Sequence, residues 1–303
     1  MTEPVLALFG PTASGKTAVA EAVAERIPAE IVSADSMQVY RGLPILTAQP
    51  ERPTRLVAVW ELDHDASVGE YQHLAQQAID EILAAGKAPI VVGGTGLYFR
   101  AALADLDLPP APTPGARERW ESIYDEQGGV RAHGLLSESD PETAATVHPN
   151  DRRRVVRALE LAESGVSLRA GQSRLWTDAT RHPTVVFGLD LAKEELDQRI
   201  EARAREMFAK GVRAEVERAL SAPMSDTARH ALGLAELAEH SDDEPAVEAL
   251  IRRTRRYASY QRKWMRRIPD LVSLPANRPP GETADEILEV ARARQRLPAG
   301  RAG

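Results

Sequence analysis

The sequence predicts an α/β protein: a doubly wound parallel sheet of the P-loop NTPase type, with a helical insertion and additional C-terminal helices. Three observations support this prediction. Short apolar runs alternate with helical patterns in the N-terminal third of the chain, as expected for a parallel sheet with helices on both faces. The first apolar run leads into a glycine-rich phosphate-binding motif. The alternation then stops at a proline-rich stretch, and charged helical patterns fill most of the C-terminal half.

The elements of the N-terminal third follow from these patterns. Val5–Phe9 is short, wholly apolar and followed by glycine, which is typical of a buried parallel strand. Ser67 has the N-cap position of a long helix, with Glu70 at capping-box spacing and Gly86 at its end. The predicted elements are a strand over 5–9, a helix over 16–27, strands over 30–33 and 56–60, a helix over 67–85, a strand over 89–92 and a helix after Gly96.

The pattern changes after residue 104. Prolines between residues 106 and 114 exclude regular structure there. We therefore predict a core domain of residues 1–104 and 166–303, interrupted by a helical insertion domain of residues 105–165. The later elements are a strand over 184–189, charged helices over 194–267, a short strand over 271–273, a helix over 284–296 and a disordered tail from residue 297.

Composition excludes several classes of protein. The 303 residues contain no cysteine, so disulfides and thiolate chemistry are absent. No apolar run approaches the roughly 18 residues of a membrane span, and the N-terminus lacks a signal-peptide pattern. The histidines show no metal-ligand spacing. We expect a cytoplasmic protein without a membrane partner.

The formal net charge of −7 argues against a nucleic-acid partner, but the basic residues are unevenly distributed. One cluster comprises Arg152, Arg153, Arg154 and Arg157. Another runs from Arg252 to Arg267 without any Asp or Glu, interleaved with Tyr257, Tyr260 and Trp264. Such runs are often solvated helix faces. The preference for Arg over Lys and the interleaved aromatic residues favour a surface that binds phosphate or RNA.

The segment after the first strand matches the pattern G-x-x-x-x-G-K-[ST] in the required strand–loop–helix context. Its backbone N–H groups and the following helix N-terminus create a site for a diphosphate or triphosphate. Lys16 would hold phosphate oxygens, and the Thr17 hydroxyl would ligate Mg²⁺. The predicted diphosphate- or nucleotide-binding residues are Gly10, Pro11, Thr12, Ala13, Ser14, Gly15, Lys16 and Thr17.

Two polar residues follow other predicted strands. Asp35 comes just after the strand over 30–33, at the sheet edge where ligands of doubly wound folds bind. It is a candidate general base or metal ligand, or alternatively a helix N-cap. Thr95 follows the strand over 89–92 in the run Gly93-Gly94-Thr95-Gly96, where hydrolytic P-loop enzymes usually carry Asp. The glycines permit close approach of a substrate, although Thr95 also suits an N-cap.

These segments together resemble the tRNA dimethylallyltransferases. The resemblance rests on the P-loop, on Ser33-Ala34-Asp35-Ser36-Met37-Gln38-Val39-Tyr40-Arg41-Gly42 and on Gly93-Gly94-Thr95-Gly96-Leu97-Tyr98-Phe99. Further matches occur in family order: Asp140-Pro141, His148-Pro149-Asn150-Asp151, Arg157-Ala158-Leu159-Glu160, Gly188-Leu189-Asp190, Arg199-Ile200, Met207 and Gly211. The series spans residues 5–264.

The resemblance implies transfer of a dimethylallyl group from dimethylallyl diphosphate to the N6 amine of the tRNA adenosine 3′-adjacent to the anticodon. The donor diphosphate would occupy the P-loop with Mg²⁺. The flipped-out adenosine would lose a proton to Asp35, and Lys16, Thr17 and Thr95 would complete the catalytic set. The implied contacts with the anticodon stem-loop are Asp35, Ser36, Met37, Gln38, Thr95, Arg152, Arg153, Arg154 and Arg157. The enzyme is expected to act as a monomer.

The chain departs from the family pattern at several positions. Leu46 and Gln49 replace the usual Gly and Lys, and Leu234 and Tyr260 replace Tyr and Arg. His230, next to Arg229, has the position of the family Arg, so the Arg that assists the diphosphate is not identified by the motif.

Three other functions are compatible with parts of the sequence. An isopentenyltransferase acting on free AMP or ATP would share the fold but would not need the insertion or the Arg-rich helices. A small-molecule kinase could use Arg152–Arg157 as a lid, but the Gly-Gly-Thr strand end argues against it. A nucleotide-dependent RNA-binding module would leave Asp35 and Thr95 without a purpose.

Overall fold

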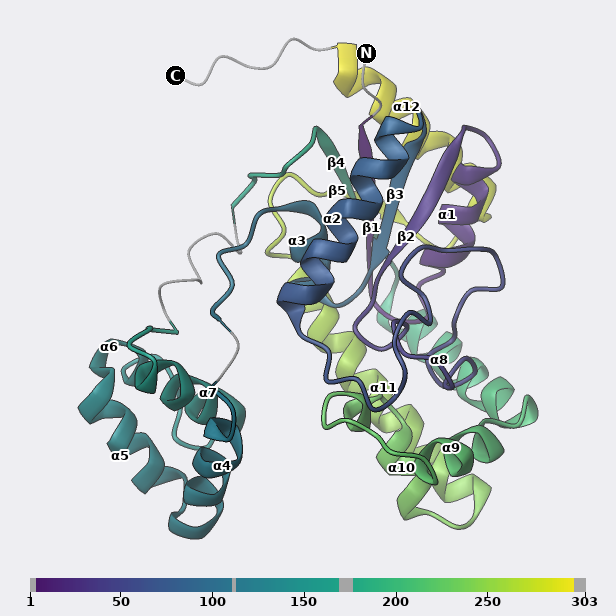
Figure 1. The fold of residues 1–303 in the computed structure, drawn as a ribbon. Helices are drawn as coiled ribbons and strands as arrows, with labels where there is room; N and C mark the ends of the chain where they lie inside the picture. Colours follow the sequence, from purple (N-terminus) through teal and green to yellow (C-terminus); the bar gives the residue numbers. More distant parts are fainter. Residues whose placement is uncertain (1–3, 111–112, 169–176, 297–303) are drawn as a thin grey trace. The chain divides into compact units, whose positions relative to one another are not determined.

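A computed structural model describes residues 4–110, 113–168 and 177–296. The chain divides into two compact units (Figure 1). The core unit comprises residues 1–104 and 180–303, and the insertion unit comprises residues 105–179. The tail predicted from residue 297 lies outside the described residues. In the described ranges, no helix is both long and apolar enough to cross a bilayer.

The core unit is built on a five-stranded parallel sheet, with the strands in the order β2-β3-β1-β4-β5. The strands are β1 (Val5–Phe9), β2 (Ala29–Ala34), β3 (Ala88–Gly93), β4 (Thr184–Asp190) and β5 (Val272–Pro275). Every residue of β1 is buried, which explains why this central strand is apolar throughout. The predicted α/β fold with a parallel sheet is confirmed.

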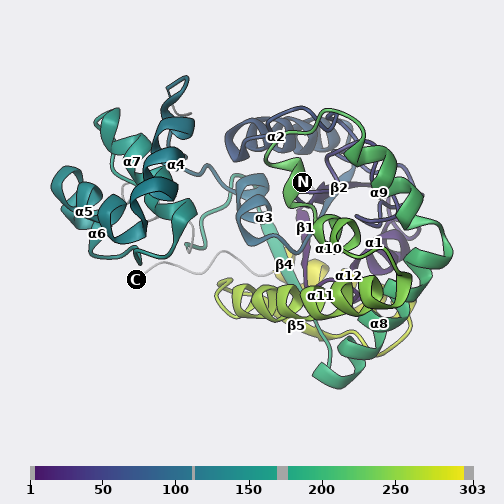
Figure 2. The same cartoon turned by 90° about the horizontal axis from the view of Figure 1, so that it is seen from below.

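Helices cover both faces of this sheet (Figures 1 and 2). They are α1 (Lys16–Ala24) and α12 (Pro280–Arg296) on one face, and α2 (Val68–Ala84) and α3 (Gly96–Leu103) on the other. The capping prediction for α2 is confirmed, because the Ser67 hydroxyl accepts a hydrogen bond from the Glu70 N–H at 3.1 Å. Gly86 follows this helix with a positive φ of 69°.

The register of the sheet brings three turns together at one edge. The last residue of β1, Phe9, pairs with Gly93 of β3 and with Gly188 of β4, and Ala34 at the end of β2 also pairs with Gly93. The P-loop, Asp35 and Thr95 therefore all follow strands that end at the same level. This is the edge at which doubly wound sheets bind ligands.

The C-terminal helices lie beyond this edge (Figure 1). They are α8 (Lys193–Ala209), α9 (Val212–Leu220), the 3₁₀ turn η1 (Ala228–His230), α10 (Leu234–Glu239) and α11 (Asp243–Met265). The buried face of α11 packs Ala258, Gln261 and Met265 into the core unit. The predicted additional helices are thus confirmed, and they cover the edge that carries the motifs.

The strand predicted over residues 56–60 is wrong. Leu56 and Ala58 have φ values of 63° and 53°, which an extended strand does not allow. Only isolated bridges join this segment to the sheet region, from Arg55 to Val32 and from Trp60 to Tyr40. The apolar run instead folds as a loop that returns along the segment after β2.

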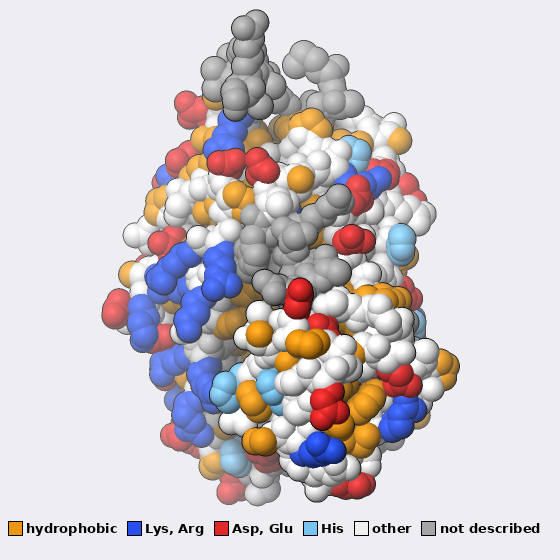
Figure 3. Space-filling model, turned by 90° about the vertical axis from the view of Figure 1, so that its left-hand side faces the viewer, with side chains coloured by type: hydrophobic (Ala, Val, Ile, Leu, Met, Phe, Trp, Pro, Cys, Tyr) orange, Lys and Arg blue, Asp and Glu red, His pale blue; other side chains and the backbone are white. Residues whose placement is uncertain are grey.

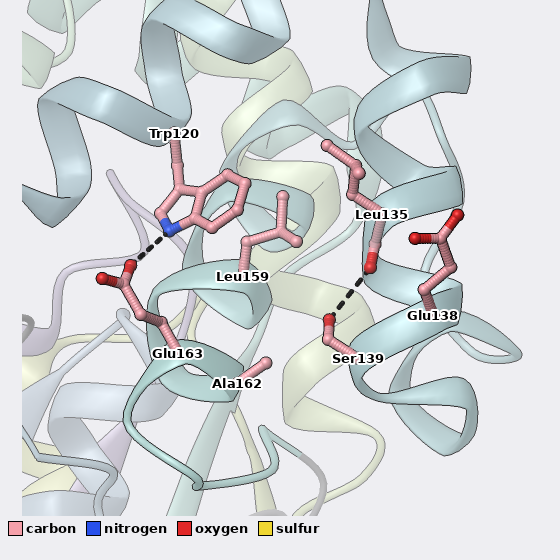
Figure 4. Close-up of a pocket in the computed structure, with 7 residues that line it drawn as sticks. All are labelled: Trp120, Leu135, Glu138, Ser139, Leu159, Ala162 and Glu163. Carbon is pink, nitrogen blue, oxygen red and sulfur yellow. Dashed lines mark hydrogen bonds between the residues drawn. The ribbon is translucent and has the colours of Figure 1, made fainter.

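The insertion unit is helical, with α4 (Ala116–Gln127), α5 (Gly129–Ser139), α6 (Pro141–Ala144) and α7 (Arg152–Glu163). Its small core includes Leu136, Val155 and Leu159, with Trp120 packed against it. Beside Trp120 lies a pocket of about 320 Å³, whose lining residues are drawn in Figure 4. The Trp120 indole N–H donates to Glu163 at 2.8 Å and so joins α4 to α7.

This unit continues past residue 165, where the sequence predicts its end. The Ser167 hydroxyl donates to the Asp140 carboxylate at 2.8 Å, and Leu168 packs against the core of the unit. These contacts keep the segment after α7 with the insertion unit, whose last residue is Ala179.

Candidate functional site

The P-loop connects β1 to α1 in a conformation that requires glycine. Gly15, which precedes the first residue of α1, has a φ of 88°. A Cβ on Gly10 would lie 2.9 Å from the Ser14 hydroxyl. That hydroxyl is buried, and no described residue forms a hydrogen bond with it. A buried hydroxyl without a partner, just before the first residue of a helix, is suited to a phosphate oxygen.

Lys16 points back over this loop. Its Nζ donates to the Pro11 carbonyl at 2.7 Å. The pKa of Lys16 is lowered to about 7, mainly by burial; the neighbouring Asp35 carboxylate opposes this shift, and the Arg203 guanidinium adds to it. An anion bound in the loop would favour the charged form of Lys16.

Arg203 is a second cation at the P-loop, and none of the sequence motifs contains it. It comes from α8, and its Nη1 donates to the Thr12 hydroxyl at 3.3 Å. Burial lowers its pKa, while Asp35 and Glu206 raise it. Two cations held next to each other favour a bound anion.

Arg229 and His230, by contrast, lie exposed in η1. The i+4 spacing of Arg203 from the recognised Arg199 was the available sequence signal, because both residues then lie on one face of α8.

Asp35 uses its two oxygens differently. Oδ1 accepts hydrogen bonds from the Met37 N–H at 2.9 Å and the Gln38 N–H at 3.4 Å. Oδ2 has no hydrogen-bond partner among the described residues. Residues 36–39 form a turn and no helix begins there, so the N-cap interpretation of Asp35 is wrong. Oδ1 instead closes this turn and fixes the orientation of the carboxylate, and Oδ2 remains open to a substrate group.

Thr95 precedes the first residue of α3, but its side chain makes no capping hydrogen bond. Its hydroxyl lies 3.1 Å from the Tyr257 hydroxyl. Burial, with a smaller contribution from the Asp35 carboxylate, raises the pKa of Tyr257 to about 12. Tyr257 therefore keeps its proton at neutral pH and can orient the Thr95 hydroxyl.

One face of α11 completes this edge of the sheet. Gln261 accepts a hydrogen bond from the Thr12 N–H at 2.8 Å, through its Oε1. A Cβ on Gly94 would lie 2.3 Å from the Gln261 Nε2, and one on Gly96 would lie 1.9 Å from Trp264. From the sequence, the glycines of this turn are expected to permit close approach of a substrate. The structure gives another reason at Gly94 and Gly96, since side chains of α11 fill the space beside them.

The segment after Asp35 is held by polar side chains. The Gln38 carboxamide accepts from the Ser33 hydroxyl at 2.8 Å and donates to the Thr47 and Ala48 carbonyls at 3.2 and 3.0 Å. Ser36 and Met37, predicted to contact RNA with Gln38, are half-buried. Of these three side chains, Gln38 is already engaged within the loop.

Glu215 is another residue that the sequence analysis missed. Its carboxylate is buried and accepts hydrogen bonds from the Ile45 N–H at 2.9 Å and the Leu46 N–H at 2.8 Å. Gln49, where the family pattern has Lys, donates to the Gln38 and Tyr40 carbonyls at 3.3 and 2.8 Å. These contacts fix the loop that in turn holds Gln38.

The basic cluster at residues 152–157 belongs to the insertion unit, and its members differ in their environment. Arg152 forms ion pairs with Asp125 at 2.7 Å and Glu121 at 3.1 Å. Arg157 pairs with the buried Glu160 at 2.9 Å. Arg152 thus joins α7 to α4, whereas the Arg157 pair lies within α7, and Arg157 also donates to the Pro110 carbonyl at 2.5 Å.

Arg153 and Arg154 are exposed at the start of α7. Arg153 has no ion pair to a described residue, and Arg154 lies 3.6 Å from Asp151.

Comparisons with known proteins all match this chain to the same family of enzymes. A family model described as IPP transferase matches residues 38–268, and one described as Isopentenyl transferase matches residues 3–55. The chain is 41% identical to a tRNA dimethylallyltransferase of Thermobifida fusca (strain YX) over 292 residues, 91% of each chain. It is 41% identical over 278 residues to one of Streptomyces coelicolor, covering 88% of each.

Solved structures show the same relationship. The full-length tRNA isopentenylpyrophosphate transferase of Bacillus halodurans superimposes with a TM-score of 0.69 at 30% identity, covering 97% of this chain and 99% of that one. A eukaryotic dimethylallyltransferase acting on tRNA gives a TM-score of 0.81 at 23% identity, covering 100% of this chain and 82% of that one. The second likeness concerns the fold alone.

Proposed function

This chain belongs to the IPP transferase family of tRNA dimethylallyltransferases, and from that premise we propose how its own residues carry out the reaction. The enzyme transfers a dimethylallyl group to the N6 amine of the adenosine 3′-adjacent to the anticodon, giving N6-(dimethylallyl)adenosine. The observation that carries our assignment is that Lys16, Arg203 and Asp35 meet at one sheet edge.

The diphosphate of dimethylallyl diphosphate binds in the loop of residues 10–17. Backbone N–H groups, the unpaired Ser14 hydroxyl and the Lys16 ammonium surround its oxygens. Arg203, already in contact with Thr12, faces the same anion. Lys16 would exchange its bond to the Pro11 carbonyl for one to the donor.

The residues present also fit Mg²⁺. The described residues contain no group of three His, Asp or Glu side chains that could hold a metal alone. Mg²⁺ commonly binds through one or two side chains together with substrate phosphates and water. Thr17 is placed for that role at the start of α1, and the ion would neutralise charge on the diphosphate.

Asp35 acts as the general base. The adenine N6 forms a bond to the allylic carbon while the bond from that carbon to the diphosphate oxygen breaks. Oδ2 of Asp35 accepts the proton that the amine loses. Lys16 and Arg203 stabilise the negative charge that develops on the departing diphosphate. Thr95, oriented by Tyr257, contacts the substrate near the reacting carbon.

The RNA contacts follow from exposure and charge. The adenosine must leave its stack to reach Asp35. Ser36 and Met37 flank the flipped base, while Gln38 shapes the loop that carries them. In the insertion unit, Arg153 and Arg154 are the members of the cluster that bind the tRNA backbone, because their side chains are exposed, whereas Arg152 and Arg157 are half-buried and paired with acids. We propose that the enzyme works as a monomer in the cytoplasm.

Transfer of radiolabel from dimethylallyl diphosphate, with Mg²⁺ present, tests this function directly. We expect label in unmodified tRNA and none in AMP. Label in AMP alone would identify a free-nucleotide prenyltransferase, and ATP consumption without label transfer would identify a kinase.

The insertion-unit proposal makes a separate prediction. Arg153→Ala and Arg154→Ala should each weaken tRNA binding and reduce the slope of log affinity against log salt by about one, since each removes one phosphate contact. Fluorescence anisotropy with an anticodon stem-loop, measured over a salt series, gives both quantities. Arg131→Ala, which removes an exposed Arg from α5 of the same unit, is the matched control. Equal salt slopes in all these variants would contradict the assignment.

A further inference from the structure

The outer side of α11 carries an aromatic residue among cations. Tyr260 is 54% exposed and is the one aromatic residue among the exposed large hydrophobic side chains of the described residues. Arg256 precedes it by one helical turn, and Lys263 follows by about one turn. These three side chains therefore form one stripe, opposite the buried face of Ala258 and Met265.

Within this basic segment, some cations are neutralised and others are not. The Arg residues paired with acids within 3.6 Å are Arg252, Arg253, Arg255 and Arg262. Among the described residues, Arg256, Lys263 and Arg266 have no acidic partner. Figure 3 shows Lys and Arg side chains gathered along the side on which α11 lies. The field of this stripe attracts polyanions.

Tyr260 is also close to the reaction site in chain and in space. Its ring meets Trp264 edge-on, with the centroids 6.4 Å apart and the planes at 70°. Trp264 packs on Gly96, and Tyr257 lies beside Thr95. The Trp264 ring therefore lies between Tyr260 and the turn that carries Thr95.

We propose that Tyr260 stacks on a base of the acceptor RNA next to the target adenosine, while Arg256 and Lys263 bind the adjacent phosphates. Exposed aromatic rings between unpaired cations are the pattern by which proteins hold unstacked nucleotides. Flipping the adenosine exposes the faces of its neighbours, and one such face needs a new stacking partner. The edge-on contact with Trp264 limits the rotation of the Tyr260 ring, so the platform exists before RNA binds.

This inference rests on the proposed function and identifies a residue for acceptor recognition. Tyr260 stands where the family pattern has Arg. A Tyr ring at this position would bind RNA by stacking on a base. An Arg guanidinium would also stack, but part of its attraction to RNA would come from its charge.

The experiment compares Tyr260→Ala with Tyr260→Phe in steady-state transfer to tRNA. Tyr260→Ala should raise the KM for tRNA by about 5- to 150-fold, the loss expected from one stacked base. Tyr260→Phe should stay near wild type, because the ring is retained. The KM for dimethylallyl diphosphate should be unchanged in both. Ser259→Ala, an exposed neighbour on the same helix, is the matched control.

Two results would overturn the proposal. A tRNA KM for Tyr260→Ala that matches the Ser259→Ala control would show that no base stacks there. A parallel rise in the KM for the donor would show that Tyr260 supports Trp264 rather than RNA. Failure of the proposed function itself would look different, because wild-type enzyme would then transfer no label to tRNA.

Discussion

Replacing Asp35 with Asn is expected to slow dimethylallyl transfer by about 10²- to 10⁴-fold, the usual contribution of a positioned general base. The substituted side chain keeps an oxygen that can accept the Met37 and Gln38 N–H bonds, so the loop after β2 should keep its shape. It has no oxygen that can take the proton released by the amine. Single-turnover transfer of label to saturating tRNA measures this chemical step.

Donor binding is the control for this variant. Asp35→Asn should bind dimethylallyl diphosphate at least as well as wild type, because it removes a negative charge near the P-loop. Asp35→Ala should lose the same activity and additionally loosen the loop, which hydrogen exchange at Met37 and Gln38 would report. A transfer rate within tenfold of wild type for Asp35→Asn would exclude Asp35 as the base.

Replacing Arg203 with Ala is expected to lower kcat/KM for dimethylallyl diphosphate by about 10²- to 10³-fold, comparable to losing one preorganised donor to a developing anion. Arg203 is half-buried, with its guanidinium in contact with Thr12 of the P-loop, where charge is screened less by solvent than at the open surface. The variant should bind the donor more weakly and should also release the diphosphate more slowly in the chemical step.

The matched control is Arg205→Ala on the same helix. Arg205 is half-exposed and pairs with Glu244 and Glu201, so its loss should change kcat/KM little. The affinity for inorganic pyrophosphate, measured by calorimetry, shows how much of the Arg203 effect is on binding of the diphosphate group and how much is on the chemical step. Equal activity in the two variants would mean that Lys16 and Mg²⁺ suffice, and would remove Arg203 from the proposal.

The residues that directly follow a predicted strand could be placed from the sequence. The P-loop, Asp35 and Thr95 each directly follow a short apolar run, and parallel strands bring such positions to one edge. The local pattern is therefore sufficient to place these three positions at the same edge of the sheet. The same approach failed over residues 56–60, because an apolar run does not reveal the positive φ of Leu56 and Ala58.

The residues that the sequence analysis missed act over long separations. Arg203 reaches Thr12 across 191 positions, and Glu215 reaches Leu46 across 169. Each depends on how a C-terminal helix docks on the sheet edge, which no local periodicity specifies. The cluster of Arg152 to Arg157 shows that residues next to each other in sequence can have different environments. Arg152 and Arg153 are adjacent in sequence, yet only Arg152 has acidic partners, Asp125 being 27 positions away.

The bond between the Thr12 N–H and Gln261 has a consequence for biosynthesis, because it closes a loop of 249 residues. The ribosome makes β1 and the P-loop first and α11 near the end. Contacts of such high sequence separation form only after the whole intervening chain is available. A nascent chain that ends before α11 therefore carries every P-loop residue without the anchor that holds Thr12. The P-loop therefore gains this last hydrogen bond only when synthesis is almost finished.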